Sequence, residues 1–239
     1  MSAADKQFPV VLAADAAFAR WAPSYDETPN PLTALEERLL APLLGDFAGR
    51  DILDLGCGTG RWLQRLQGIN PRSLVGIDAS SAMIAQARRK YLRSALLIEA
   101  ECTSTPVASC SADLVLASFL LSYVEDISRF AAEAARILRP GGTLIVSDLH
   151  PETPSYGWRR TIKVSEKRFE IATFPYSFAA LFAAINNVGL LLEDFAERSF
   201  GEEETKIFRV NGMAEQCDRV KSLPVIYYAR FSRGVEGTC

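Results

Sequence analysis

The fold of this chain is decided by the stretch Asp51-Ile-Leu-Asp54-Leu-Gly56-Cys-Gly58-Thr-Gly60. Its first half reads as a short, mainly aliphatic strand, and its second half carries three glycines in five positions. Glycine permits positive φ and has no Cβ, so the backbone can turn tightly and approach a ligand closely. Because a helical pattern begins directly afterwards, the stretch predicts a strand, a ligand-binding turn and a helix, in that order.

Short apolar runs alternate with helical patterns downstream of this turn. We expect strands at 52–55, 73–77, 95–99, 114–117 and 143–147, and helices at 61–67, 80–93 and 127–138. A helix at 177–188 and strands at 190–195 and 225–231 complete the pattern. This alternation predicts an α/β fold, with a mostly parallel sheet of about seven strands and helices on both faces.

The alternation breaks at 150–175, where two prolines are followed by aromatic residues and then by a charged stretch. We interpret this segment as a small cap insertion in a single domain, 1–239, which opens with an N-terminal helical segment, 1–47. The pieces 161–164 and 169–173 fit a hairpin around 165–167, and a broken helix fits them as well.

Composition excludes several classes of protein. With 26 Lys and Arg against 29 Asp and Glu, the net charge of −3 gives no cationic field for nucleic acid or anionic lipid. No apolar run approaches the roughly 20 residues that span a bilayer, so we expect no membrane insertion and a cytoplasmic protein. The five cysteines include no CxxC pair, so we expect no metal site. We expect a monomer or a homodimer.

Charge and spacing at the glycine turn indicate the kind of ligand. A dinucleotide fingerprint would place its last glycine where Arg61 stands, and Asp54 would repel a pyrophosphate. A carboxylate there suits a cationic ligand, such as a sulfonium amino acid with an ammonium group. Asp78 ends the second strand about 20 residues further on, where a carboxylate can accept both ribose hydroxyl hydrogens. A helix N-cap is the alternative role for Asp78.

The stretch 53–60 resembles the first motif of the Rossmann-like S-adenosylmethionine-dependent methyltransferases, of the small-molecule type that includes quinone- and biotin-pathway enzymes. The resemblance implies a Rossmann-like fold, the cofactor S-adenosyl-L-methionine and the product S-adenosyl-L-homocysteine. It assigns the methionine part of the cofactor to the glycine turn at Gly56, Cys57, Gly58 and Gly60, and the amino group to Asp54.

The same resemblance implies roles for residues beyond the turn. Asp78, with Ala79 beside it, takes the ribose, and Met83 covers the adenine unless it simply packs in the core. The adenine contacts are assigned to three residues after the third strand, Glu101, Cys102 and Thr103.

Three assignments depart from or extend the family pattern. Thr105 and Val107 replace the usual leucine and phenylalanine, so an exposed acidic loop is the alternative at 101–103. The tip of the fourth strand, Ser118 and Phe119, is expected on the methionine side. Upstream, the resemblance implies that Tyr25 closes the cofactor pocket. Its alternative role is to tether a helix through aromatic packing.

The acceptor is less well defined. The Asn/Asp-Pro-Pro-Tyr signature is missing at 118–121, which argues against methylation of DNA bases or amide nitrogens and favours a small, apolar or aromatic acceptor. O-, N- and C-methylation all stay open. His150, the only histidine, follows the fifth strand and is the candidate base, although a turn residue is the simpler interpretation.

Weaker candidates and other functions also stay open. Asp148 and Glu152 are weaker candidates for the base, and Tyr123, Tyr156 and Trp158 either line an acceptor pocket or pack the cap. The alternative functions are a cofactor-binding protein with regulatory or other chemistry, and an NAD(P)-dependent oxidoreductase.

Overall fold

One seven-stranded sheet forms the centre of the protein. The computed structural model describes residues 10–27, 29–90, 95–164 and 167–236, and orders the strands of this sheet β4-β3-β2-β5-β6-β10-β9. They are β2 (Asp51–Leu55), β3 (Ser73–Asp78), β4 (Ala95–Glu99), β5 (Ala112–Ser118), β6 (Leu138–Leu149), β9 (Leu190–Arg198) and β10 (Ile226–Arg233). β10 pairs antiparallel with both β6 and β9, and all other neighbouring strands of this sheet pair in parallel. The predicted α/β fold with about seven mostly parallel strands is confirmed.

Helices cover both faces of this sheet, as predicted. Alternate residues of a strand point to opposite faces, so Ile52 packs with the helices on one side and Leu53 with those on the other. The first side holds α2 (Pro31–Leu44), α3 (Arg61–Leu66) and α4 (Ser81–Arg89), and the second holds α5 (Ile127–Ile137) and α6 (Phe178–Asn186).

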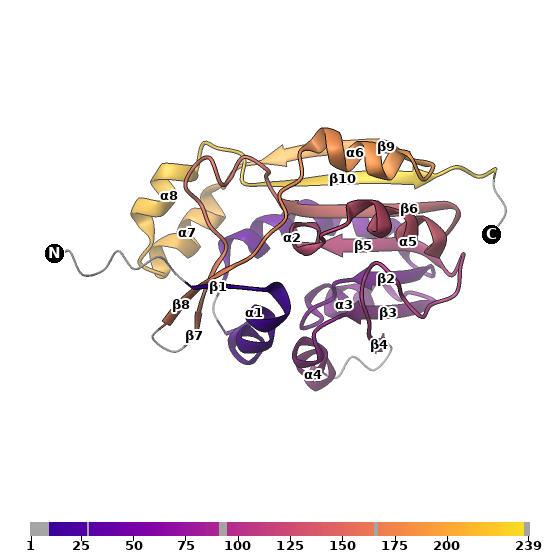
Figure 1. Ribbon diagram of the computed structural model, residues 1–239, viewed down its shortest axis with the longest axis horizontal. Coiled ribbons are helices and arrows are strands. Elements are labelled where there is room, and N and C mark those ends of the chain that lie inside the picture. The colour runs from indigo at the N-terminus through magenta and orange to yellow at the C-terminus, as the bar shows by residue number, and fades with distance from the viewer. Residues whose placement is uncertain (1–9, 28, 91–94, 165–166, 237–239) are drawn as a thin grey trace.

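A second, three-stranded sheet lies beside α1 (Ala14–Trp21), next to the central sheet (Figure 1). It contains the predicted hairpin, β7 (Thr161–Val164) and β8 (Lys167–Ile171), and β1 (Val10–Leu12), which pairs with β8 in parallel. The hairpin inside the cap segment is therefore confirmed in place of the broken helix. The turn at 165–166 and the end of the predicted helix at 91–93 lie outside the described residues.

Two helices that the sequence analysis missed connect β9 to β10. They are α7 (Glu202–Val210) and α8 (Ala214–Val220), which lie near the small sheet in Figure 1. The buried Glu204 side chain accepts from Gly201 N at 2.7 Å and from Arg38 Nη2 of α2 at 3.1 Å. This pair of contacts caps α7 and holds it against α2.

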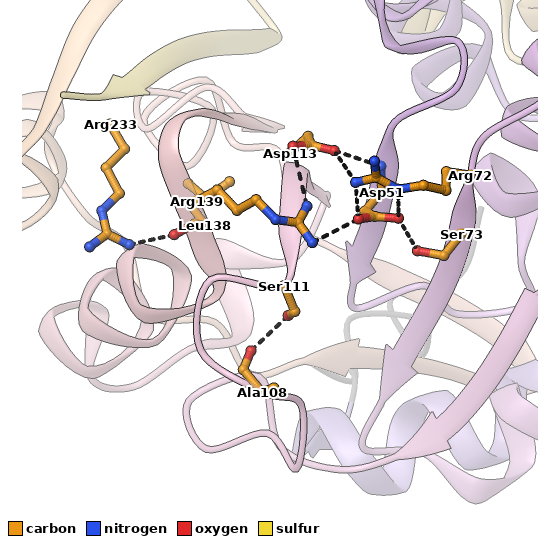
Figure 2. Close-up of polar contacts among 9 residues, drawn as sticks. All are labelled: Asp51, Arg72, Ser73, Ala108, Ser111, Asp113, Leu138, Arg139 and Arg233. Carbon is orange, nitrogen blue, oxygen red and sulfur yellow. Dashed lines mark hydrogen bonds and ion pairs between the residues drawn. The ribbon is translucent and has the colours of Figure 1, made fainter. Parts of the chain in front are cut away.

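The amino ends of the central strands are joined by charged side chains (Figure 2). Asp51 Oδ2 lies 2.7 Å from Arg139 Nη2, and the Asp51 carboxylate also binds Arg72 and Ser73. These contacts, led by the hydrogen bond from Arg72, hold the pKa of Asp51 well below its usual range. Asp113 Oδ2 accepts from Asp51 N at 2.8 Å, so the cluster ties β2 to β5 as well as to β3. It lies at the opposite end of β2 from the glycine turn.

In the described ranges, no helix is both long enough and apolar enough to cross a membrane.

Candidate functional site

A cavity of about 940 Å³ opens at the carboxyl ends of β2, β3 and β5. Ligands bind at this edge in open α/β sheets. Of the predicted cofactor residues, the following line the cavity: Tyr25, Asp54, Gly56, Cys57, Gly58, Asp78, Ala79, Met83, Glu101, Cys102, Thr103, Ser118 and Phe119. Gly60 is not one of the described residues that line the cavity. It is the N-cap of α3, with φ of 79°. The fold therefore brings together residues spread over nearly 100 positions of the sequence.

The glycine turn has the backbone geometry that its sequence predicts. Gly56 and Gly58 have φ of 71° and 55°, in the left-handed region that favours glycine. A Cβ on Gly56 would lie 2.7 Å from Leu120 Cδ1, so a side chain there would collide with the loop after β5. A Cβ on Gly58 would meet nothing within 4 Å, because Gly58 faces the open cavity. The turn thus leaves bare backbone against the space where a ligand would lie.

Asp54 is a buried acid without a partner. Its side chain is 1% exposed, and neither carboxylate oxygen has a hydrogen-bond partner among the described residues. Burial raises the pKa of Asp54 well above its usual value, with Glu36 and Asp78 adding to the rise and Arg61 opposing it. A buried polar group without a partner is costly and needs an explanation. A cationic ligand group in the cavity would supply the missing partner.

Asp78 lies between the glycine turn and the start of α4. Its carboxylate accepts from Gly58 N and from Ser80 N, each at 2.8 Å, so it joins the glycine turn to the start of α4. The N-cap of α4 is Ser80, whose side chain accepts from Met83 N at 3.4 Å. Each carboxylate oxygen has a second acceptor position, so Asp78 can still receive hydroxyl hydrogens from the cavity. Met83 is 2% exposed and contributes both to the core and to the cavity wall.

The loop after β4 is partly exposed and is anchored by Glu133 of α5. Glu101 is exposed at the cavity edge, while burial raises the pKa of Cys102 to about 12, which keeps it a neutral thiol. Glu133 accepts from Thr105 N at 2.7 Å and pairs with Arg136, which orders the loop where its sequence departs from the family pattern. The loop is therefore acidic at its tip and anchored at its base.

The sequence analysis missed a buried carboxylate behind the cavity, Glu36 on α2. It is 0% exposed and accepts hydrogen bonds from Ser118 Oγ at 2.5 Å, from Trp62 Nε1 at 3.2 Å, and from Ser147 and Arg61. Arg61 lines the cavity, and its Nη1 is buried without a partner. Glu36 thus balances the charge of Arg61 while leaving one of its donors free toward the cavity side.

The N-terminal segment closes one side of the cavity. Tyr25 packs against Trp21 with 4.5 Å between ring centroids, and burial raises its pKa, so its hydroxyl stays protonated. Asp26 accepts from Thr59 Oγ1 at 3.0 Å and pairs with Lys90 Nζ at 2.8 Å. These contacts tie the segment to the glycine turn and to α4. Tyr25 is therefore both a wall of the cavity and part of an aromatic tether.

His150 is not placed to act as the base. It is 5% exposed, its Nε2 is bonded to Glu197, and its Nδ1 accepts from Glu152 N at 3.1 Å. It lines only a small adjoining cavity of about 80 Å³, together with Asp148. Both ring nitrogens are thus occupied, so the structure contradicts the predicted base role and favours the turn interpretation of His150.

The aromatic candidates for the acceptor pocket do not all line the same cavity. Tyr123 lines the large cavity and Trp158 lines the small one, whereas Tyr156 lines neither among the described residues. Phe119 is 7% exposed and has φ of 49°, an uncommon conformation for a bulky residue that tends to occur at functional sites. Arg160, from the cap segment, lines both cavities and was missed by the sequence analysis.

Fold and site together define a Rossmann-like protein with a pocket for a nucleoside ligand that carries a positive charge. Residues 53–146 match the family model of a methyltransferase domain. The chain is 34% identical over 142 residues to a malonyl-[acyl-carrier protein] O-methyltransferase of Xylella fastidiosa, covering 57% of this chain and 48% of that protein. It is also 34% identical over 140 residues to a demethylmenaquinone methyltransferase of Tropheryma whipplei, covering 56% and 58%.

A solved structure agrees with this relationship at the level of the fold. An S-adenosylmethionine-dependent methyltransferase from Mesorhizobium loti superposes with a TM-score of 0.69 at 21% identity, covering 85% of this chain and 100% of that one. Over residues 53–146 the chain is thus similar to methyltransferase domains, and it shares the fold of this solved S-adenosylmethionine-dependent methyltransferase. It spans about half the length of the curated relatives that it matches.

Proposed function

We propose that this protein transfers a methyl group from S-adenosylmethionine to a small-molecule acceptor. The observation that carries the proposal is Asp54, a buried carboxylate without a partner beside a glycine turn. The ammonium group of the cofactor satisfies it, and a pyrophosphate would be repelled by it. The NAD(P)-dependent alternative is disfavoured on the same ground.

Each part of the cofactor is assigned to residues of the cavity wall. Asp54 takes the ammonium group, the free Nη1 of Arg61 takes the carboxylate, and the backbone at Gly58 lies against the methionine chain. Asp78 accepts from the ribose hydroxyls, and Glu101 receives the adenine amino group at the exposed edge. This arrangement follows the order of the strands, from β4 at the adenine to β5 at the methionine.

The bound cofactor supplies an electrophilic methyl group on a sulfonium. The protein must then hold the nucleophile in line, with the reacting atoms roughly 3–3.5 Å apart, so positioning and exclusion of water provide much of the rate. Tyr25 and Tyr123 line the cavity, and burial raises the pKa of Tyr123 to about 12. Both phenols stay protonated near neutral pH, so they donate hydrogen bonds to the acceptor and do not act as bases.

The acceptor class follows from the cavity and from the relatives. The cavity wall is rich in aromatic side chains, one of them Phe174 from the cap segment, and neither curated relative described above is named for a nucleic acid. A cytoplasmic monomer or homodimer is part of the same proposal, supported by the sequence alone. The chief alternative is a protein that binds the cofactor for regulation or for chemistry other than methyl transfer, since the fold does not dictate function.

Calorimetric titration tests the cofactor assignment. We expect S-adenosylhomocysteine to bind and NADH not to bind. Asp78→Ala should weaken S-adenosylhomocysteine binding at least about tenfold, because charged hydrogen bonds contribute about 1.5–3 kcal/mol. Binding of NADH in place of S-adenosylhomocysteine would overturn the proposal, and an unchanged affinity in Asp78→Ala would remove the ribose assignment.

A further inference from the structure

Three arginines line the cavity, Arg61, Arg129 and Arg160. The guanidinium of Arg160 lies 5.3 Å from the centroid of the Phe119 ring, at the carboxyl end of β5. Its charge also acts on the Tyr123 side chain. Arg160 comes from the cap segment and lines both the large and the small cavity. It therefore stands where the cap meets the central sheet.

The charge of Arg160 has no anionic partner in the described part of the chain. No carboxylate lies within ion-pair distance of it there, and its Nε is buried without a hydrogen-bond partner. The nearby acid is Asp148, whose two oxygens already accept from Ser122 N and Leu149 N, each at 2.7 Å. Arg160 is only partly exposed, and a charge held partly out of water without a counter-charge is costly, because buried charges are normally paired.

We propose that the methyl acceptor carries a carboxylate and that Arg160 is the residue that binds it. This inference rests on the proposed function and names the substrate class for it. A guanidinium binds a carboxylate through paired donors in a fixed geometry. The neighbouring aromatic residues of the cavity wall, Phe119, Tyr123, Phe174 and Tyr176, suit an apolar or aromatic body on the same molecule.

The cofactor also has a carboxylate, but a different cation is better placed for it. The ammonium and carboxylate of an amino acid share one carbon atom, so their partners must lie close together. Arg61 is the cation that acts on the charge of Asp54, and it has a free Nη1. Arg160 acts on Tyr25 as Arg61 does, but it lies over the Phe119 ring at the end of β5. We therefore assign one cation of the cavity wall to each ligand, Arg61 to the cofactor and Arg160 to the acceptor.

The test measures binding of 3-phenylpropanoate and of its neutral amide to the protein, with and without saturating S-adenosylhomocysteine. We expect the wild type to bind the carboxylate at least tenfold more tightly than the amide. Arg160→Gln should abolish that preference and Arg160→Lys should restore part of it, with S-adenosylhomocysteine affinity unchanged in both. The matched control is Arg159→Gln, since Arg159 is the neighbouring arginine, half-exposed and 3.7 Å from Glu170; its preference should equal that of the wild type.

Three results would overturn the proposal: equal binding of carboxylate and amide by the wild type, a preference that survives in Arg160→Gln, or a preference lost equally in Arg159→Gln. Weaker S-adenosylhomocysteine binding by Arg160→Gln, with the preference retained, would assign Arg160 to the cofactor instead. Failure of the wild type to bind S-adenosylhomocysteine would count against the proposed function alone, because the carboxylate preference is also measured without it. The comparison of carboxylate and amide binding by the wild type can overturn the proposal even if Arg160→Gln does not fold.

Discussion

Replacing Asp54 with asparagine should stabilise the unliganded protein and weaken S-adenosylhomocysteine binding at least about 100-fold. The carboxyl group is 1% exposed and has no partner in the described part of the chain, so an amide removes a buried ionisable group that costs about 1–3 kcal/mol when unpaired. The melting temperature should rise by roughly 2–4 °C for each kcal/mol in a protein of this size. The loss of affinity is larger, because the cofactor ammonium would then be buried without its counter-charge, at about 3–5 kcal/mol.

The pH dependence of this effect has a definite sign. The pKa of Asp54 is raised, so the folded protein binds more protons than the unfolded chain, and its stability falls as pH rises above the unfolded pKa. The penalty should be absent below about pH 4 and grow above it. Binding of the ammonium favours the carboxylate form, so affinity should rise with pH and binding should release a proton. Asp54→Asn should lose both dependences.

Asp51→Asn is the matched control, because Asp51 begins the strand on which Asp54 lies. Its pKa is lowered by Arg72 and other donors, so its contribution to stability is present above the unfolded pKa and is lost as pH falls through the folded pKa. Asp51→Asn should therefore destabilise the protein at neutral pH and leave S-adenosylhomocysteine binding intact. Chemical unfolding and calorimetry of both variants would measure this. If Asp54→Asn binds like the wild type, Asp54 does not hold the cofactor.

Removing the Glu36 carboxylate should give the largest loss of stability. Glu36→Leu leaves Arg61 buried without its counter-charge and takes the acceptor from Ser118, Ser147 and Trp62. Breaking one side of a buried ion pair costs about 3–5 kcal/mol, so the melting temperature should fall by roughly 10 °C or more. Thermal unfolding monitored by circular dichroism would measure it.

Two further variants make this prediction specific. Glu37→Leu is the matched control, since Glu37 is the adjacent acid and pairs with Arg65 on the partly exposed surface; its cost should be about 0–1 kcal/mol. The double variant Glu36→Leu with Arg61→Met should recover much of the lost stability, because replacing a buried pair by apolar residues is often neutral. A single variant as stable as the wild type would show that the Glu36 network does not support the fold.

The cofactor half of the site could be predicted because its determinants are local in the sequence. Gly56 and Asp78 each stand directly after an apolar strand, and parallel strands bring such positions to one edge. The alternation of strands and helices predicted the seven-stranded sheet for the same reason. The glycines predict a tight turn, and the adjacent carboxylate favours a ligand with a positive charge.

The residues that were missed depend on contacts between distant parts of the chain. Glu36 lies within a charged stretch of a helix and reads as an exposed position, until Arg61 and Ser147 meet it in three dimensions. Arg160 lies in a charged run of the cap, and nothing in its local sequence places it over Phe119. His150 was favoured as the only histidine, yet both of its ring nitrogens are already bonded.

The helices α7 and α8 did leave a local signal. Gly201, followed three residues later by Glu204, resembles a helix start, and three acids occupy the first turn. The sequence contains almost no local signal for β1, because its three residues form a strand only by pairing with β8. Local patterns thus predict the sheet and most of the residues that line one wall of the cavity, whereas the contacts of Glu36 and Arg160 depend on tertiary structure.

Transfer of a labelled methyl group tests the central claim most directly. The protein would be incubated with methyl-labelled S-adenosylmethionine and a panel of small molecules, with Asp54→Asn in parallel, and products would be identified by mass spectrometry. We expect label in a low-molecular-mass product, an equal amount of S-adenosylhomocysteine, and neither with Asp54→Asn. Label that stays on the cofactor despite tight binding, or that enters nucleic acid instead, would contradict the account.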